Sequence, residues 1–255
     1  MIGNILGNVV GFLLMLGVPL AACIYYLWKR DGRIWMFFAG ILSFTVSQLL
    51  IRIPLLQYAG KKWEWLMLLP YTSLVLYYGF LGLTAGLFEE TGRWAAFSLM
   101  KRRRRALDWK DALALGLGHG GVEAVWVAVS GLMAGNFDFT AAGGRTLLGG
   151  VEAVWVAVSG LLAGNLDFTA DGSQVLLGGV ERLFAMTLHV GFSFLIFKGV
   201  EEKKARWWLL AVLLHGLTDF QLVIGNLAVV EGLLAIEAVA VLLLVVRFVR
   251  REERS

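Results

Sequence analysis

All three histidines of this 255-residue chain lie in long apolar segments, and each has a charged residue at helical spacing. Residues four apart face the same side of a helix, so this spacing brings an imidazole and its partner together. The pairs are His119 with Glu123, His215 with Asp219, and His189 with Arg182, which lies two helical turns away. A charge at the centre of a bilayer costs about 2.5–3.5 kcal/mol, so these residues are candidates for function.

A fourth apolar segment carries Glu89-Glu90-Thr-Gly-Arg93. Adjacent carboxylates in a poorly solvated site repel each other, so one can take a proton from water while Arg93 keeps the other ionised. Neutral histidines could polarise a carbonyl or donate to a developing oxyanion. This set of residue types indicates hydrolysis of an amide by an activated water molecule.

Other hydrolytic chemistries have weaker support in the sequence. Cys23, the single cysteine, lies in a segment without histidine, and no Gly-x-Ser-x-Gly motif occurs. His-x-x-x-Glu and His-x-x-x-Asp could bind zinc, but the His-Glu-x-x-His motif is absent. We therefore expect no cofactor and no assigned metal ligand, with zinc as the second possibility.

The elements that carry these residues are membrane helices. The chain is 58% hydrophobic and 16% charged, which excludes a soluble enzyme and predicts a multi-pass, all-α membrane protein. About seven transmembrane helices are predicted, at 5–28, 34–58, 66–100, 111–135, 175–200, 207–227 and 229–249. The candidate residues lie about 12–18 Å along their helices from the nearest charged ends. Because this depth is shared, we expect them to meet in one layer.

The basic residues predict the orientation. With the N-terminus outside, seventeen Lys and Arg fall on the inner side and three on the outer side. This asymmetry follows the positive-inside rule, so we expect a cell-membrane protein with a cytoplasmic C-terminus and no nucleic-acid partner. Arg52, close to Pro54 and Lys61, is expected to extend to the outer interface.

An internal duplication lies within what we expect to be a single membrane domain over residues 1–255. Residues 120–148 recur at 149–177 with six differences. The duplication adds an apolar stretch at 146–164, and a further crossing there would erase the charge asymmetry. We therefore predict that 146–164 adds no net crossing.

Four motifs resemble those of the YhfC-type intramembrane proteases, which look related to the CAAX-prenyl protease (CPBP) and PrsW groups. They are Glu-Glu-Thr-Gly-Arg at 89–93, Gly-His-Gly-Gly-Val-Glu-Ala at 118–124, Glu-Arg-Leu-Phe-Ala with a histidine at 181–189, and His-Gly-Leu-Thr-Asp-Phe at 215–220. The resemblance implies that Glu89 and Glu90 activate water and that His119 and His215 assist it or contact the oxyanion. It implies supporting roles for Arg93, Glu123, His189 and Asp219, to which the spacing adds Arg182.

We therefore expect an intramembrane endopeptidase of glutamic type that cleaves a membrane-associated peptide or protein within the lipid bilayer. Two alternatives stay open. Chains of acidic and histidine side chains also relay protons in proton-coupled transporters, and an inactive membrane scaffold could retain the same residues.

Overall fold

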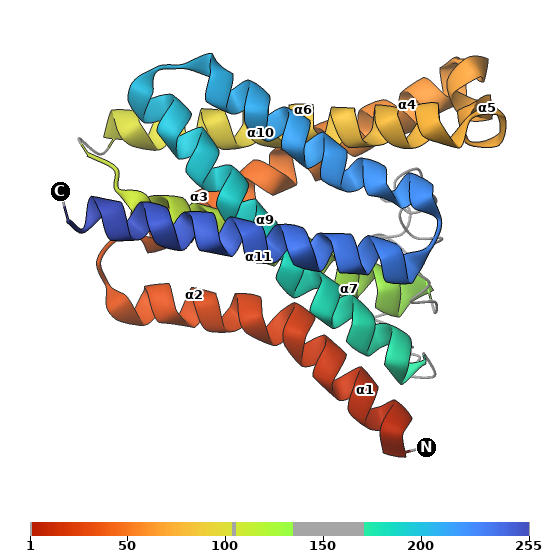
Figure 1. Cartoon of the computed structure of the whole chain (residues 1–255), viewed down its shortest axis with the longest axis horizontal. Helices are drawn as coiled ribbons and strands as arrows, with labels where there is room; N and C mark the ends of the chain where they lie inside the picture. Colours follow the sequence, from red (N-terminus) through yellow and green to blue (C-terminus); the bar gives the residue numbers. More distant parts are fainter. Residues whose placement is uncertain (1, 104–105, 135–170, 255) are drawn as a thin grey trace.

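The computed structural model describes residues 2–103, 106–134 and 171–254. Nearly all of these residues are helical, which confirms the all-α membrane class (Figure 1). The α-helices are α1 (Ile2–Phe12), α2 (Val18–Lys29), α3 (Ile34–Phe44), α4 (Ile53–Lys62), α5 (Glu64–Thr72), α6 (Leu74–Arg103), α7 (Trp109–Ala134), α9 (Gly172–Glu202), α10 (Ala205–Phe220) and α11 (Leu227–Glu252). Two π-helical segments, η1 (Leu13–Gly17) and η2 (Thr45–Arg52), join α1 to α2 and α3 to α4, and a 3₁₀ turn, η3 (Gln221–Ile224), follows α10.

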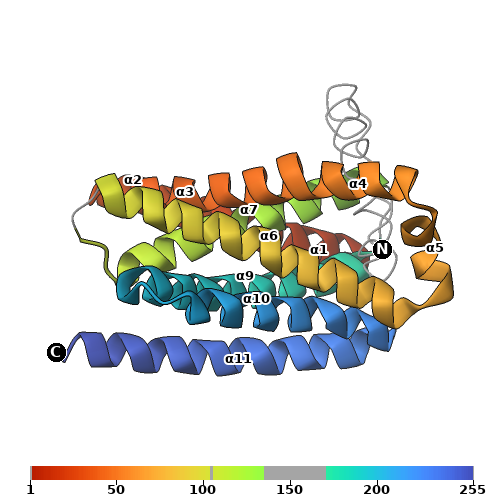
Figure 2. The same ribbon diagram turned by 90° about the horizontal axis from the view of Figure 1, so that it is seen from above.

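Six helices of the described residues are long and apolar enough to cross a membrane. They are Gly3–Lys29, Ile34–Lys62, Trp109–Gly131, Gly172–Glu202, Ala205–Ile224 and Leu227–Glu252. The 30-residue helix α6 is not among them, and it carries Glu89, Glu90 and Arg93 in its interior besides three basic residues in its last turn. It lies against α3 and α10, so it belongs to the same bundle (Figure 2).

The predicted segment 66–100 is wrong as a single helix. The chain breaks at Ser73, whose backbone is extended at φ −156° and ψ 101°, and α5 and α6 lie on either side of it. Pro70 lies inside α5, where it has no backbone N–H to donate and its ring crowds the preceding turn. The predicted segment 146–164 lies outside the described residues, as does most of the duplication at 120–148 and 149–177.

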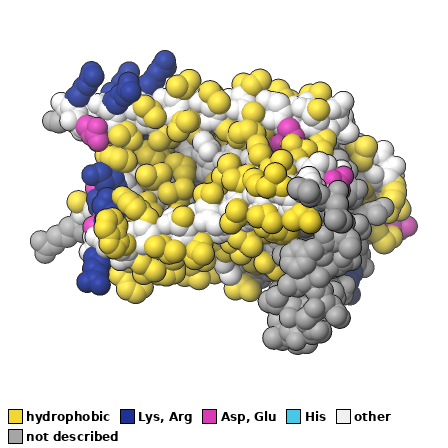
Figure 3. Space-filling model, turned by 90° about the horizontal axis from the view of Figure 1, so that it is seen from below, with side chains coloured by type: hydrophobic (Ala, Val, Ile, Leu, Met, Phe, Trp, Pro, Cys, Tyr) yellow, Lys and Arg dark blue, Asp and Glu magenta, His cyan; other side chains and the backbone are white. Residues whose placement is uncertain are grey.

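Apolar side chains cover most of the described face of the bundle in Figure 3, and lysine and arginine gather at one end of it. We call this the basic end; the ends of α2, α6, α9 and α11 with the start of α7 define it. There Arg33 forms ion pairs with Asp31 at 2.7 Å and Asp108 at 2.5 Å, which ties the α2–α3 turn to the start of α7. Burial alone would raise the pKa of Asp31, but hydrogen bonds from Arg33 outweigh it and lower that pKa.

Glycines allow the helix backbones to approach closely beside the candidate site. A Cβ atom on Gly118 would lie 2.0 Å from the carbonyl oxygen of Phe37, and one on Gly40 would lie 2.1 Å from that of Leu115. Helices α3 and α7 therefore pack with their backbones almost in contact. The same occurs between α6 and α10, where a Cβ on Gly86 would lie 2.4 Å from the carbonyl oxygen of Val212.

The Gly118→Ala substitution should lower the stability of the folded protein, because its methyl group has no room against the α3 backbone. Overpacking of this kind costs about 1–3 kcal/mol. Gly232→Ala is the matched control, because nothing lies within 4 Å of the added atom. Thermal unfolding in detergent should show a clear fall in Tm for Gly118→Ala and little change for Gly232→Ala. Equal Tm values for the two variants would contradict the close packing.

Candidate active site

The four predicted catalytic residues and the predicted supporting residue His189 meet in the interior of the bundle. Glu89 and Glu90 on α6, His119 on α7, His189 on α9 and His215 on α10 are each at most 5% exposed. The ring centroid of His189 lies 5.2 Å from that of His119 and 5.5 Å from that of His215. The expected single layer of ionisable groups is therefore present in the structure, and His189 belongs to it although the duplication precedes α9.

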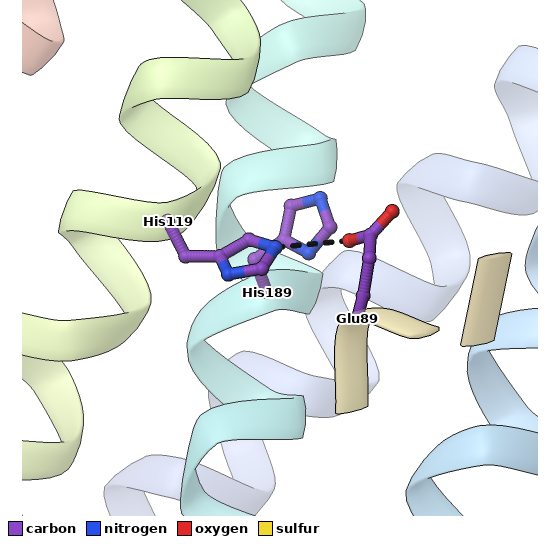
Figure 4. A group of neighbouring side chains, drawn as sticks. All are labelled: Glu89, His119 and His189. Atoms are coloured by element: carbon purple, nitrogen blue, oxygen red, sulfur yellow. Dashed lines mark hydrogen bonds and ion pairs between the residues drawn. The ribbon is translucent and has the colours of Figure 1, made fainter. Parts of the chain in front are cut away.

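Glu89 is the residue that joins three helices at the site. Its Oε2 atom lies 2.9 Å from Nε2 of His119, and the two side chains point toward each other with His189 beside them (Figure 4). The same oxygen lies 3.8 Å from Nε2 of His215 and 3.8 Å from Nη2 of Arg93. The other oxygen, Oε1, accepts a hydrogen bond of 2.5 Å from Nε2 of Gln48. Both oxygens of this buried carboxylate are therefore engaged.

Glu90 contacts Arg93 and His215 more closely than Glu89 does. Its Oε1 atom contacts Nη1 of Arg93 and lies 2.7 Å from Nδ1 of His215. Its Oε2 atom is buried and has no hydrogen-bond partner among the described residues. A buried acceptor without a donor is unusual in folded proteins, and at a reaction centre it is free to take a proton.

The hydrogen bonds of His119 restrict its tautomer. Ser43 Oγ lies 2.8 Å from Nδ1 of His119 and also 2.9 Å from the carbonyl oxygen of Gly40, to which it donates. When the one hydroxyl hydrogen goes to Gly40, Nδ1 of His119 carries the hydrogen shared with Ser43. The lone pair of Nε2 then faces the carboxylate of Glu89, and two facing lone pairs require a proton or a cation between them.

His189 is held at both ring nitrogens. Nη2 of Arg93 lies 2.5 Å from Nδ1, and because an arginine can only donate, Nδ1 is the acceptor. Nε2, which then carries the hydrogen of the neutral ring, contacts Oε2 of Glu123. Glu123 in turn accepts a hydrogen bond of 2.9 Å from Arg182, which also contacts Glu181. The structure thus brings the predicted supporting residues Arg93, Glu123 and Arg182 to the site.

Asp219 lies at the edge of this group. Its Oδ2 atom is 3.9 Å from Nε2 of His215, and its side chain is 38% exposed. It lines a cavity of about 310 Å³ that also reaches Glu89, His189 and His215. On α6 the lining residues run from Glu89 to Tyr78, and on α7 from Glu123 to Gly131. Since α6 ends and α7 begins at the basic end, the cavity extends from the site toward the opposite end of the bundle.

Three residues of the site were not identified from the sequence. Ser43 and Gln48 contact His119 and Glu89, and Arg52 donates to Oε1 of Gln48 at 2.9 Å. The expectation that Arg52 extends to the outer interface is wrong, because its side chain is 1% exposed and bonds the Leu81 carbonyl oxygen at 2.7 Å. The available signal was the four-residue spacing of Gln48 and Arg52 within an apolar segment, the same spacing as in the pairs His119–Glu123 and His215–Asp219.

Fold and site together define a multi-pass membrane protein with a buried acid–histidine centre. The chain matches the model of the YhfC intramembrane metalloprotease family over residues 13–244, and it belongs to this family. It is similar to "Uncharacterized membrane protein YhfC" of Bacillus subtilis (strain 168), with 29% identity over 244 residues that cover 93% of this chain and 90% of that protein. No solved structure matches the chain.

The family confirms the resemblance found in the sequence and supports an intramembrane protease. Its description names a metalloprotease, so it gives no support to our first expectation of no cofactor. Glu89, His119 and His189 are all buried, and each offers a ligand atom within 4.8 Å of the others. These three residues could hold a metal ion. The roles of the individual residues stay predictions.

Proposed function

We propose that the protein is a zinc-dependent intramembrane endopeptidase that hydrolyses a peptide bond of a membrane-associated peptide or protein. The observation that carries this proposal is the buried set of Glu89, His119 and His189, whose ligand atoms lie within 4.8 Å of one another beside a second glutamate. One carboxylate and two imidazoles, with a position left for water, is a ligand set used by catalytic zinc sites.

The residues present fit a metal ion in their hydrogen bonding as well as in their type. The facing lone pairs of His119 and Glu89, 2.9 Å apart, are the arrangement that a cation would satisfy. His189 would bind through Nδ1 and keep its contact with Glu123, in the carboxylate–histidine–metal arrangement common around zinc. This requires Arg93 to leave Nδ1 of His189.

Zinc, when bound, would polarise the scissile carbonyl and acidify a water molecule. Glu90 would take the proton of that water on Oε2, the oxygen without a partner, and pass it to the leaving amine. Arg93 would keep Glu90 ionised before this transfer, because it contacts the other oxygen of the carboxylate. His215 would donate a hydrogen bond to the developing oxyanion. Its 2.7 Å contact with Glu90 would hold the imidazole ring in place.

The cavity supports a peptide substrate. It has a mixed lining, with charged residues next to the site and apolar residues such as Phe44, Trp126 and Leu234 around them. A membrane-spanning peptide segment matches this lining, because its backbone groups need hydrogen-bond partners and its side chains are mostly apolar. We propose that the scissile segment occupies this cavity.

The charge distribution supports an orientation in the cell membrane. The basic end would face the cytoplasm, which places the N-terminus outside and the C-terminus inside. The cavity would then open toward the outside. A C-terminal reporter that labels only in permeabilised cells would support this orientation, and labelling in intact cells would contradict it.

Metal removal is the test of the proposed function. The purified protein, reconstituted in vesicles with a library of membrane-spanning peptides, should cleave a subset of them. Treatment with 1,10-phenanthroline should abolish cleavage, and added zinc should restore it. Mass spectrometry of the products would locate the scissile bonds within the membrane-spanning part of each peptide. Cleavage that resists the chelator would contradict metal dependence, and proton flux without cleavage would favour the transporter.

A further inference from the structure

A line of polar side chains leads from η2 into the site. Gln48 is 8% exposed, and its amide nitrogen donates to Oε1 of Glu89 at 2.5 Å. Its amide oxygen accepts from Nη1 of Arg52 at 2.9 Å. Because one end of the amide receives and the other donates, Arg52 fixes which end of Gln48 faces Glu89.

Arg52 is itself held in one position. Beyond Gln48, its guanidinium donates to the carbonyl oxygen of Leu81 at 2.7 Å and to Oγ1 of Thr84 at 3.1 Å. In the described part of the chain, all three of these acceptors are neutral. A buried cation that bonds only neutral groups bears a desolvation cost of several kcal/mol that no contacting carboxylate offsets. Its hydrogen bond to Gln48 connects it to the carboxylate of Glu89, which Gln48 contacts in turn.

The backbone that carries both residues departs from the α-helix. Thr45–Arg52 is π-helical, and the N–H of Ile53 bonds the carbonyl of Gln48, five residues back. Such segments are rare and occur frequently at functional sites. Here the segment directs Ser47, Gln48 and Arg52 into the interior within an otherwise apolar helix.

We propose that Gln48 and Arg52 are positioning residues that hold Glu89 as a metal ligand. Gln48 occupies Oε1 of Glu89, which leaves Oε2 directed at His119 and the metal position, and Arg52 keeps the amide of Gln48 in the orientation that donates. Outer hydrogen-bond partners of metal ligands contribute to affinity in this way. The inference rests on the proposed metal site and adds two residues that act on it from outside.

The test measures metal affinity directly. Zinc dissociation constants of the purified protein in detergent would be obtained by competition with a chromophoric chelator. Gln48→Met removes the donor while keeping the side-chain length, and it should weaken zinc binding about 10- to 100-fold. Arg52→Gln should weaken it in the same direction. Gln221→Met is the matched control, because Gln221 also donates to a glutamate, Glu237, but neither residue lines the cavity.

The double variant decides whether Arg52 and Gln48 act on Glu89 as one series of hydrogen bonds. If Arg52 acts through Gln48, then Gln48→Met/Arg52→Gln should bind zinc no more weakly than Gln48→Met alone. Additive losses of zinc affinity would show that Arg52 does not act through Gln48. Unchanged zinc affinity in Gln48→Met would overturn the proposal altogether. Thermal unfolding in the presence of chelator would identify a variant that fails to fold. Gln48→Glu would then replace Gln48→Met, and Arg52→Lys would replace Arg52→Gln. Weaker zinc binding is again expected, and unchanged zinc affinity would again contradict the proposal.

The failure of this inference and the failure of the proposed function are distinguishable. A wild-type protein that binds zinc tightly, together with variants that bind it equally well, would reject only the positioning role. If the wild-type protein and His119→Ala both fail to bind zinc, the metal site is rejected, and this inference is rejected with it.

Discussion

Replacement of Glu90 by glutamine is expected to lower the rate of peptide cleavage by about 100- to 10,000-fold, the usual contribution of a general base. Glutamine keeps an oxygen that can accept from Arg93 and His215, so the surrounding contacts are retained. What it loses is the ability to take a proton from water at the position of Oε2. The measurement is single-turnover cleavage in vesicles, beside zinc content per molecule.

The zinc content separates this prediction from a simple loss of the site. Glu90→Gln should retain the metal, because the ligand set is Glu89, His119 and His189. Glu237→Gln is a matched control, since Glu237 is a partly buried glutamate on α11 that accepts from Thr218 and Gln221 and does not itself line the cavity. It should cleave at the wild-type rate. Full activity in Glu90→Gln would show that another group takes the proton.

Replacement of Arg93 by methionine is expected to lower the free energy of unfolding by about 3–5 kcal/mol in the presence of chelator. Arg93 is fully buried and contacts Glu90, Glu89 and His189, so its loss leaves two buried carboxylates without their cation. The chelator matters because zinc at the site could substitute for the missing positive charge. Equilibrium unfolding in mixed micelles would measure the change.

A double variant and a control sharpen this result. Arg93→Met/Glu90→Gln should recover part of the lost stability, because one of the two unpaired charges is removed with its partner. Arg206→Met removes an arginine whose side chain is 66% exposed and whose ion pair with Glu202 spans 3.7 Å, and it should change stability little. A loss of the same size in Arg206→Met would show that the effect is not specific to the buried site.

The membrane class and much of the site could be predicted from the sequence because both depend on local rules. Apolar length predicts helices, and a charge inside such a length is costly enough to mark a residue. This reasoning located Glu89, Glu90, His119, His189 and His215, which the structure brings together. The break at Ser73 was not predicted, because Pro70 lies within a run that is apolar on both sides and hydropathy does not register an extended residue.

The contribution of η2 could not be predicted for a different reason. Whether a helix adopts a π-helical segment depends on tertiary contacts, and that segment turns Gln48 and Arg52 inward. Arg52 was misjudged because it is near Pro54 and Lys61, which suggested a route to the interface. Its actual acceptors, Leu81 and Thr84, belong to α6, and no local pattern links them to Arg52. Metal binding was ranked second because the ligands come from three helices rather than from one motif.

The position of the cavity has a consequence for inhibition. Its lining runs from the acid–histidine layer toward the end of the bundle opposite the basic end. With the proposed orientation, a charged zinc-binding compound that cannot cross lipid would still reach the reaction centre of intact cells. A hydroxamate too polar to enter the cytoplasm would then stop cleavage in living cells, whereas a centre open to the cytoplasm would require permeant drugs.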